Sequence, residues 1–105
     1  MGNKFKITAI IGDLLERYFV LEQVDVKAVK EMCFTCIGQG ICVHLPYSEK
    51  QNGWCLRLGS EITAQFRPRI CDYDLTAVLV DGNRLTLIED GLFTVRSKDN
   101  NLCED

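Results

Sequence analysis

The sequence lacks a large excess of charge of one sign, and it lacks a long hydrophobic run. Its 12 lysine and arginine residues oppose 15 acidic residues, and no block of five like charges occurs. The net charge of −3 provides no positive field for nucleic acid, so nucleic acid is disfavoured as a partner. The first apolar run, 7–11, is followed by Asp13 and Glu16, well short of a membrane span or a signal-peptide core. We expect neither a membrane partner nor export.

The sequence also lacks an Asn-x-Ser/Thr glycosylation site, although it contains six cysteines. Six cysteines in 105 residues could form a secreted disulfide framework. The absence of export signals instead favours free thiols in a reducing, cytoplasmic compartment. Hydrophobic residues make up 47% of the chain and charged residues 26%, as in average globular proteins, so a core can form without disulfides.

No internal repeat, low-complexity stretch or linker divides the chain, and its length is typical of one domain. We expect a single domain over residues 1–96. Residues 97–105 are polar and predict a flexible C-terminal tail. Cys103, in that tail, would be the most exposed thiol.

The N-terminal region predicts one strand followed by an ambiguous segment. Residues 5–10 predict a strand that ends before Gly12. In 13–21, apolar residues recur at helical spacing after Asp13, which suits a helix N-cap. The same segment is rich in strand formers, so a β-hairpin with 5–10 stays open as an alternative.

The next segment, 26–37, predicts an amphipathic helix. Asp25 is a suitable N-cap, and apolar residues follow it at intervals of three and four. Two glycines after the segment would end the helix. Cys33 and Cys36 would lie on its apolar face, and Glu31 on its solvated face.

From residue 41 onward, apolar residues alternate with polar ones, which predicts antiparallel strands. Residues 41–45 and 54–58 form the first expected hairpin, and 62–66 form a further strand that ends before Pro68. Four side chains would lie on the non-core side of that hairpin, namely Cys42, His44, Cys55 and Arg57.

The strongest turn signal is Asp81-Gly82, which suits a two-residue type I′ turn between strands 75–80 and 84–88. Residues 89–91 predict a second, three-residue turn with Gly91 in the left-handed conformation, followed by strand 92–95. In this register the core face carries Val78, Val80, Leu85, Leu87, Phe93 and Val95. The opposite face is also apolar and carries Leu75, Leu79, Ile88 and Leu92.

These elements together predict an α+β fold. A single small domain would pack an N-terminal strand and one or two helices on an antiparallel β-meander of about five strands.

Four potential zinc ligands occur within twelve residues, namely Cys33, Cys36, Cys42 and His44. A familiar structural zinc site uses two separated ligand pairs, and a cysteine on an apolar helix face packs as a small hydrophobe. Core packing is therefore the favoured interpretation, and no resident cofactor is expected. A redox role for the C-x-x-C is also disfavoured, because a stabilised thiolate needs the N-terminal end of a helix.

Catalysis by a cysteine requires a general base, and His44 is the only histidine. One register of the first hairpin would place His44 opposite Cys55. No acid is evident to orient the histidine, and no catalytic residue is assigned.

The preferred hypothesis is a non-catalytic module that binds a protein partner, or a second copy of itself, through a sheet face or edge. An adaptor, a regulator and a viral or phage-type inhibitor all fit this description. The expected binding residues are Leu75, Leu79, Ile88, Leu92 and Arg57. One alternative is a small zinc- or thiol-based protein organised by Cys33, Cys36, Cys42 and His44, and another is a cysteine-dependent enzyme using Cys55 and His44.

Overall fold

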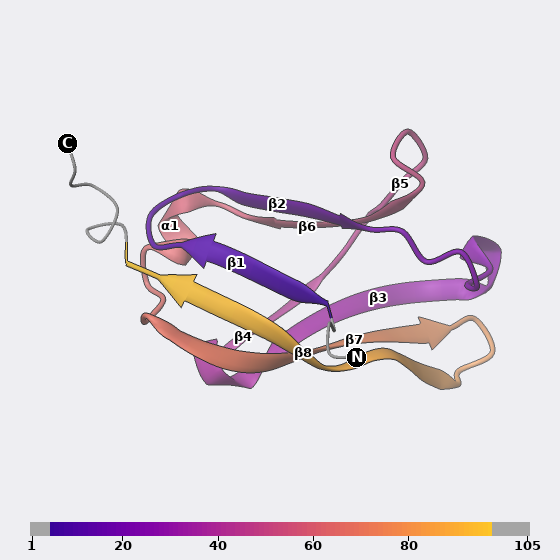
Figure 1. The fold of residues 1–105 in the computed structure, drawn as a ribbon. Helices are drawn as coiled ribbons and strands as arrows, with labels where there is room; N and C mark the ends of the chain where they lie inside the picture. The colour runs from indigo at the N-terminus through magenta and orange to yellow at the C-terminus, as the bar shows by residue number, and fades with distance from the viewer. Residues whose placement is uncertain (1–4, 98–105) are drawn as a thin grey trace.

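The computed structural model describes residues 5–97, and most of these residues lie in β-strands (Figure 1). A curled five-stranded mixed sheet contains, in spatial order, β1 (Lys6–Ile10), β8 (Arg84–Arg96), β7 (Arg69–Leu79), β3 (Val29–Cys36) and β4 (Ile41–His44). A three-stranded antiparallel sheet contains β2 (Leu15–Phe19), β6 (Gly53–Leu58) and β5 (Tyr47–Ser48). The described helical elements are the 3₁₀ turns η1 (Val26–Ala28) and η2 (Ile37–Gln39) and the helix α1 (Ser60–Thr63). The expected α+β fold with helices packed on a meander is therefore wrong.

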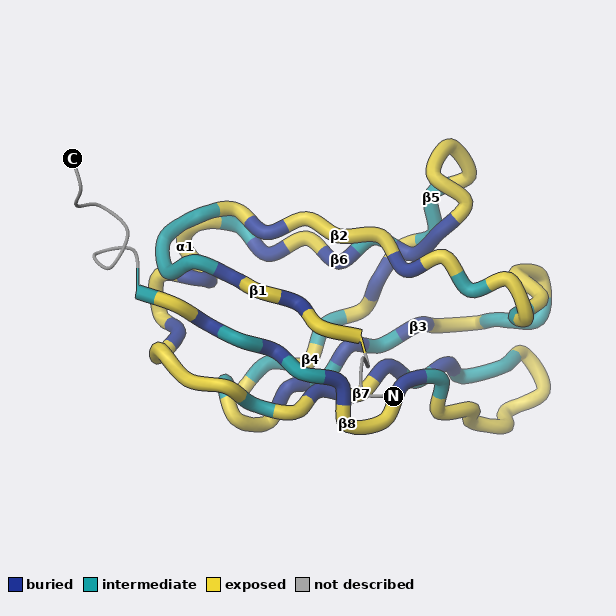
Figure 2. The backbone as a smooth tube through the Cα atoms, in the orientation of Figure 1, coloured by how far each residue is buried: buried dark blue, intermediate teal, exposed yellow. Residues whose placement is uncertain are grey.

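The two sheets share one hydrophobic core. Buried positions alternate with exposed ones along the strands, because successive strand residues point to opposite faces (Figure 2). The five-stranded sheet contributes an aromatic group in which the Phe34 ring centroid lies 4.8 Å from that of Tyr73 and 5.7 Å from that of Phe93. The three-stranded sheet contributes the fully buried side chains of Leu56 and Leu58.

The expected strand over 5–10 is confirmed as β1, but its partner is distant in sequence. β1 pairs in parallel with β8, so that Ile7 lies opposite Phe93. The helix expected over 13–21 is wrong. The alternative was correct in making this segment a strand, but β2 pairs with β6 rather than with β1. A turn at Gly12, with φ of +88°, carries the chain from one sheet to the other.

The helix expected over 26–37 is wrong. Asp25 does accept a hydrogen bond from the Lys27 amide at 3.1 Å, but it caps only the single turn of η1. The chain then enters β3, where Met32, Phe34 and Cys36 are buried on one face. Apolar residues at every second position fit a strand. The intervals of three and four residues between the apolar residues of 26–37 fit a helix equally well. The strand prevails because β3 pairs with both β7 and β4 and places Phe34 in the centre of the core.

The hairpin expected between 41–45 and 54–58 does not form, although strands do form in both segments. β4 pairs with β3, whereas β6 pairs with β2 and β5. The buried Leu45 and the following Pro46 carry the chain between the sheets, and the Cys55 amide donates to the Pro46 carbonyl at 2.8 Å.

The strand expected over 62–66 is also wrong, because α1 ends at Thr63. The Thr63 side chain is fully buried, and its hydroxyl donates to the Asp13 carbonyl at 2.8 Å. The same hydroxyl accepts from the Gly12 amide at 3.1 Å. A helical turn fits here because it brings this one polar group against the turn after β1 and satisfies it.

A turn around Asp81-Gly82 does join β7 and β8, as expected, although it is longer than two residues and spans 80–83. The second turn expected at 89–91 is wrong, because β8 continues to Arg96 and stays paired with β7 through an irregularity in the register. Asp90, with φ of 60°, adopts the left-handed conformation in place of Gly91. Gly91 is needed for space instead, since a Cβ there would lie 2.5 Å from the Tyr73 ring.

The core face expected for strands 75–80 and 84–88 is reversed, whereas Phe93 and Val95 are buried as expected. Leu75 is fully buried and Ile88 is 4% exposed, whereas Val80 is 66% exposed. The strand pairing is irregular on either side of Leu75. These irregularities change which residues of β8 share a sheet face with a given residue of β7. The three-stranded sheet covers the face that carries Leu75. This covering explains why the face expected to point away from the core is also apolar.

Candidate functional site

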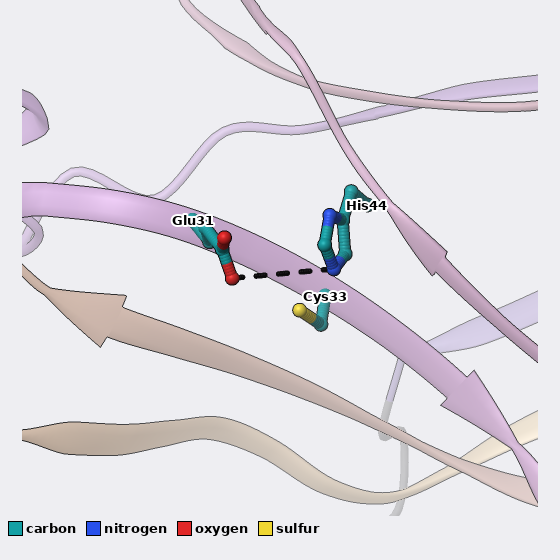
Figure 3. A group of neighbouring side chains, drawn as sticks. All are labelled: Glu31, Cys33 and His44. Carbon is teal, nitrogen blue, oxygen red and sulfur yellow. Dashed lines mark ion pairs between the residues drawn. The ribbon is translucent and has the colours of Figure 1, made fainter.

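Three potential metal ligands, Glu31, Cys33 and His44, converge beside β3 (Figure 3). They lie on the outer face of the five-stranded sheet, because the alternate residues of β3 are buried on the inner face. Cys33 lies directly opposite His44 in the β3–β4 pair, and Glu31 precedes Cys33 by two residues on the same strand face. The ligand atoms of the three side chains lie within 4.8 Å of one another, and His44 Nε2 is 4.0 Å from Glu31 Oε1. We refer to these residues as the Glu31–Cys33–His44 cluster.

The surroundings of Cys33 oppose ionisation of its thiol. Burial raises the pKa of Cys33, and the neighbouring Cys42 and Glu31 raise it further, while Arg84 acts in the opposite direction. A thiol with a raised pKa stays protonated at neutral pH and is a poor nucleophile. The raised pKa therefore disfavours Cys33 as a nucleophile.

The structure separates the four potential zinc ligands that the sequence offers. Cys36 points into the core, where burial raises the pKa of its thiol to about 11. Residues three apart on a strand face opposite sides, so Cys33 and Cys36 cannot share an ion. Cys42 does lie on the outer face, opposite Thr35, whose hydroxyl donates to Cys42 Sγ at 3.5 Å. Glu31 was expected on a solvated helix face and was therefore not predicted as a metal ligand.

His44 and Cys55 do not form the pair that a cysteine-dependent enzyme would use. β4 belongs to the five-stranded sheet, whereas Cys55 lies in β6 opposite Tyr18. Cys55 Sγ is 4.0 Å from Glu16 Oε2, which also accepts from Arg57 Nη1 at 3.3 Å. The neighbours of Cys55 are thus a phenol, a carboxylate and a guanidinium.

A cleft of about 430 Å³ lies between η2 and the first half of β7. Two apolar side chains in its lining are unusually exposed, with Ile37 at 85% and Ile70 at 66%. The charged residues of the lining are one arginine, Arg69, and three acids. The complete lining consists of Thr35, Ile37, Gly38, Arg69, Ile70, Cys71, Asp72, Asp74 and Asp90. We call this feature the η2–β7 cleft.

Hydrogen bonds hold the two walls of the η2–β7 cleft together. The Gln39 side chain donates to the Arg67 carbonyl at 2.7 Å and accepts from the Arg67 amide at 3.0 Å. Arg69 Nη1 donates to the Gly38 carbonyl at 3.2 Å. A side chain at Gly38 would overlap Cys71, so glycine permits this close approach. Contacts within the chain therefore hold the cleft in shape.

The five binding residues expected from the sequence do not form one surface. Leu75 and Ile88 are in the core, and Leu79 and Leu92 are half-buried. Arg57 is exposed but lies on the other sheet, beside Glu16. The η2–β7 cleft was missed because its two walls are about thirty residues apart in sequence.

No protein-family model and no curated protein matches this chain.

In residues 5–97, no helix is long and apolar enough to cross a membrane. The cysteines within that range, Cys33, Cys36, Cys42, Cys55 and Cys71, are all free thiols. Cys103 and the rest of the expected tail beyond Ser97 lie outside the described residues.

Proposed function

We propose that the protein is a non-catalytic interaction module whose η2–β7 cleft binds a protein segment carrying a basic residue next to an apolar one. The observation that carries this proposal is the combination of two exposed isoleucines with three carboxylates in one preformed cleft. The proposed partner is of the class expected from the sequence, but the proposed surface differs from the expected one.

The apolar part of the cleft supplies the driving force. Ile37 and Ile70 are mostly exposed to water in the free protein. Complete burial of one aliphatic side chain contributes roughly 1.5–3 kcal/mol, so covering both favours association by a few kcal/mol at most. Such a gain suits a moderate affinity that depends on additional polar contacts.

The charged part of the cleft selects the partner. Asp72, Asp74 and Asp90 oppose a single arginine, so the lining carries a net charge of −2 from three negative groups and one positive group. Asp74 Oδ1 accepts from the Asp90 amide at 3.3 Å, which keeps the part of β8 that bears Asp90 close to β7. A lysine or arginine on the partner would meet complementary charge, which increases specificity and association rate more than affinity.

A peptide-binding experiment tests this proposal. Peptides that pair one arginine or lysine with one leucine or isoleucine are compared with peptides in which glutamine replaces the basic residue. Fluorescence anisotropy should detect binding of the basic set alone, and added salt should weaken it. Ile37→Ser and Asp74→Asn should each weaken binding about tenfold or more.

Matched controls come from the opposite end of the sheet and from the other sheet. Val80 is as exposed as Ile70, and Glu49 is an exposed acid in the turn after β5. Val80→Ser and Glu49→Gln should leave peptide affinity unchanged. Binding that is lost equally in these controls, or an absence of binding by every basic peptide, would overturn the proposal.

A further inference from the structure

We infer that Glu31, Cys33 and His44 form a binding site for a divalent ion of the zinc class. The site is separate from the η2–β7 cleft, and its argument does not rest on the proposed function. It differs from the ligand set considered from the sequence, because Cys36 and Cys42 leave the set and Glu31 enters it.

The donor atoms define the class of ion. The cluster offers one carboxylate oxygen, one sulfur and one imidazole nitrogen. Zinc binds all three donor types, whereas calcium and magnesium prefer oxygen alone. The thiolate and imidazole therefore favour zinc or a similar transition-metal ion over the hard cations.

The distances between the donor atoms are close to those of an occupied site. Bond lengths of about 2.0–2.3 Å in a tetrahedron place zinc ligands roughly 3.3–3.8 Å apart. The ligand atoms of the cluster already lie within 4.8 Å of one another, and the His44–Glu31 separation is 4.0 Å. Small side-chain rotations would therefore close the site.

The fold supplies both the rigidity and the freedom that such a closure needs. The backbone is held by the β3–β4 pairing, in which Cys33 and His44 are direct partners, and by β7 on the other side of β3. The His44 and Glu31 side chains are 67% and 43% exposed, so they can rotate without disturbing the core. The outer position also leaves room for water at a fourth coordination position.

Cys42 is adjacent to the site but is not one of its ligands. It lies on the same strand face as His44, opposite Thr35, and falls outside the group of atoms that converge within 4.8 Å. The site thus has three protein ligands and an open position, an arrangement that zinc adopts where a solvent molecule completes the coordination.

The inference is tested by titrating the metal-free full-length protein with Zn²⁺ against a competing chromophoric chelator. One equivalent should bind, and Co²⁺ in its place should produce a near-ultraviolet thiolate-to-cobalt charge-transfer band. Glu31→Gln, Cys33→Ser and His44→Gln should each weaken Zn²⁺ binding at least tenfold. Cys33→Ser should also abolish the band. Unchanged circular dichroism spectra would confirm that these variants fold.

The chain contains a matched control on the other sheet. Cys55 and Glu16 repeat the thiol and carboxylate pair, with 4.0 Å between Sγ and Oε2, but without an imidazole. Cys55→Ser, Cys42→Ser and Cys103→Ser should therefore leave Zn²⁺ affinity within about threefold of the original. No Zn²⁺ binding at micromolar concentration, a band that survives in Cys33→Ser, or binding lost in any of the three controls would overturn the inference.

Discussion

The two faces of the five-stranded sheet are formed by the same strands but carry different kinds of residue. On the inner face, Phe34 and Tyr73 are almost completely buried and in ring contact. On the outer face, neighbouring positions of β3 and β7 carry Glu31, Cys33 and Asp74, which are half-buried or exposed. A step of one residue along a strand therefore changes a side chain from part of the core to part of a candidate site.

This difference means that stability and binding should respond to different substitutions. The inner face has little tolerance for changes of volume, because its aromatic rings are packed against one another. The outer face has few packing constraints, so its residues are free to be selected for binding. Substitutions at adjacent positions can test how sharp the division is.

The largest effect is expected at Phe34, next to Cys33 on β3. Phe34→Ala removes a fully buried ring and leaves a cavity, which should lower the free energy of unfolding by about 3–5 kcal/mol. Cys33→Ser, one residue away on the outer face, should lower it by less than about 1 kcal/mol. Urea denaturation of the two variants measures the contrast. Phe34→Leu is the milder substitute if the alanine variant is unfolded, and equal losses at the two positions would contradict the division.

A smaller effect is expected at Gly91, against which the Tyr73 ring packs. In Gly91→Ala the new Cβ would lie 2.5 Å from that ring, and relieving the overlap should cost about 2–3 kcal/mol of stability. The double variant with Tyr73→Leu should be less destabilised than the sum of the two single variants, because the ring is absent. Thermal denaturation of all three proteins measures this coupling, and strictly additive losses would show that the overlap is not the cause.

The smallest effect concerns the Tyr73 hydroxyl, which donates to the Phe5 carbonyl at 3.1 Å. Burial raises the pKa of Tyr73 from 10.0 to about 12, so the phenol ionises more easily in the unfolded chain. The contribution of the protonated Tyr73 phenol to the free energy of unfolding is complete below pH 10 and is lost as the pH rises towards 12. By pH 11 the loss should be roughly 1–2 kcal/mol.

Tyr73→Phe provides the control for this pH dependence. It should be less stable than the original protein at pH 7, because the hydrogen bond to Phe5 is absent. The stability difference should narrow between pH 10 and 12. Urea midpoints measured across this range would reveal it, and a constant difference would rule out Tyr73 as the titrating group.

Local patterns in the sequence predicted some elements correctly. Residue type indicated the strand over 5–10, alternating apolar residues indicated the strands in 41–45 and 54–58, and Asp81-Gly82 indicated a turn. The same reasoning failed for 26–37, because Cys36 belongs both to a helical spacing and to the alternation of Met32 and Phe34. Strand pairing on both sides of β3 decided between the two, and this pairing is not visible locally.

The candidate sites could be predicted only in part for the same reason. Cys33 and His44 were recognised by their chemistry, but the choice of Cys36 as a further ligand depended on the wrong secondary structure. Glu31 joins the cluster only because β3 is a strand that pairs with β4. The η2–β7 cleft combines Ile37 with Asp90, which are more than fifty residues apart, so no local pattern indicates it.

The sequence by itself determined where apolar residues alternate, where one turn falls, and that free thiols occur beside a single histidine. Only the tertiary structure decided which strands pair, which face of β7 and β8 enters the core, and which thiol meets His44. The physical reason is that backbone hydrogen bonds between strands are nearly independent of side chains. Partner and register are therefore chosen by the burial of side chains that are distant along the chain.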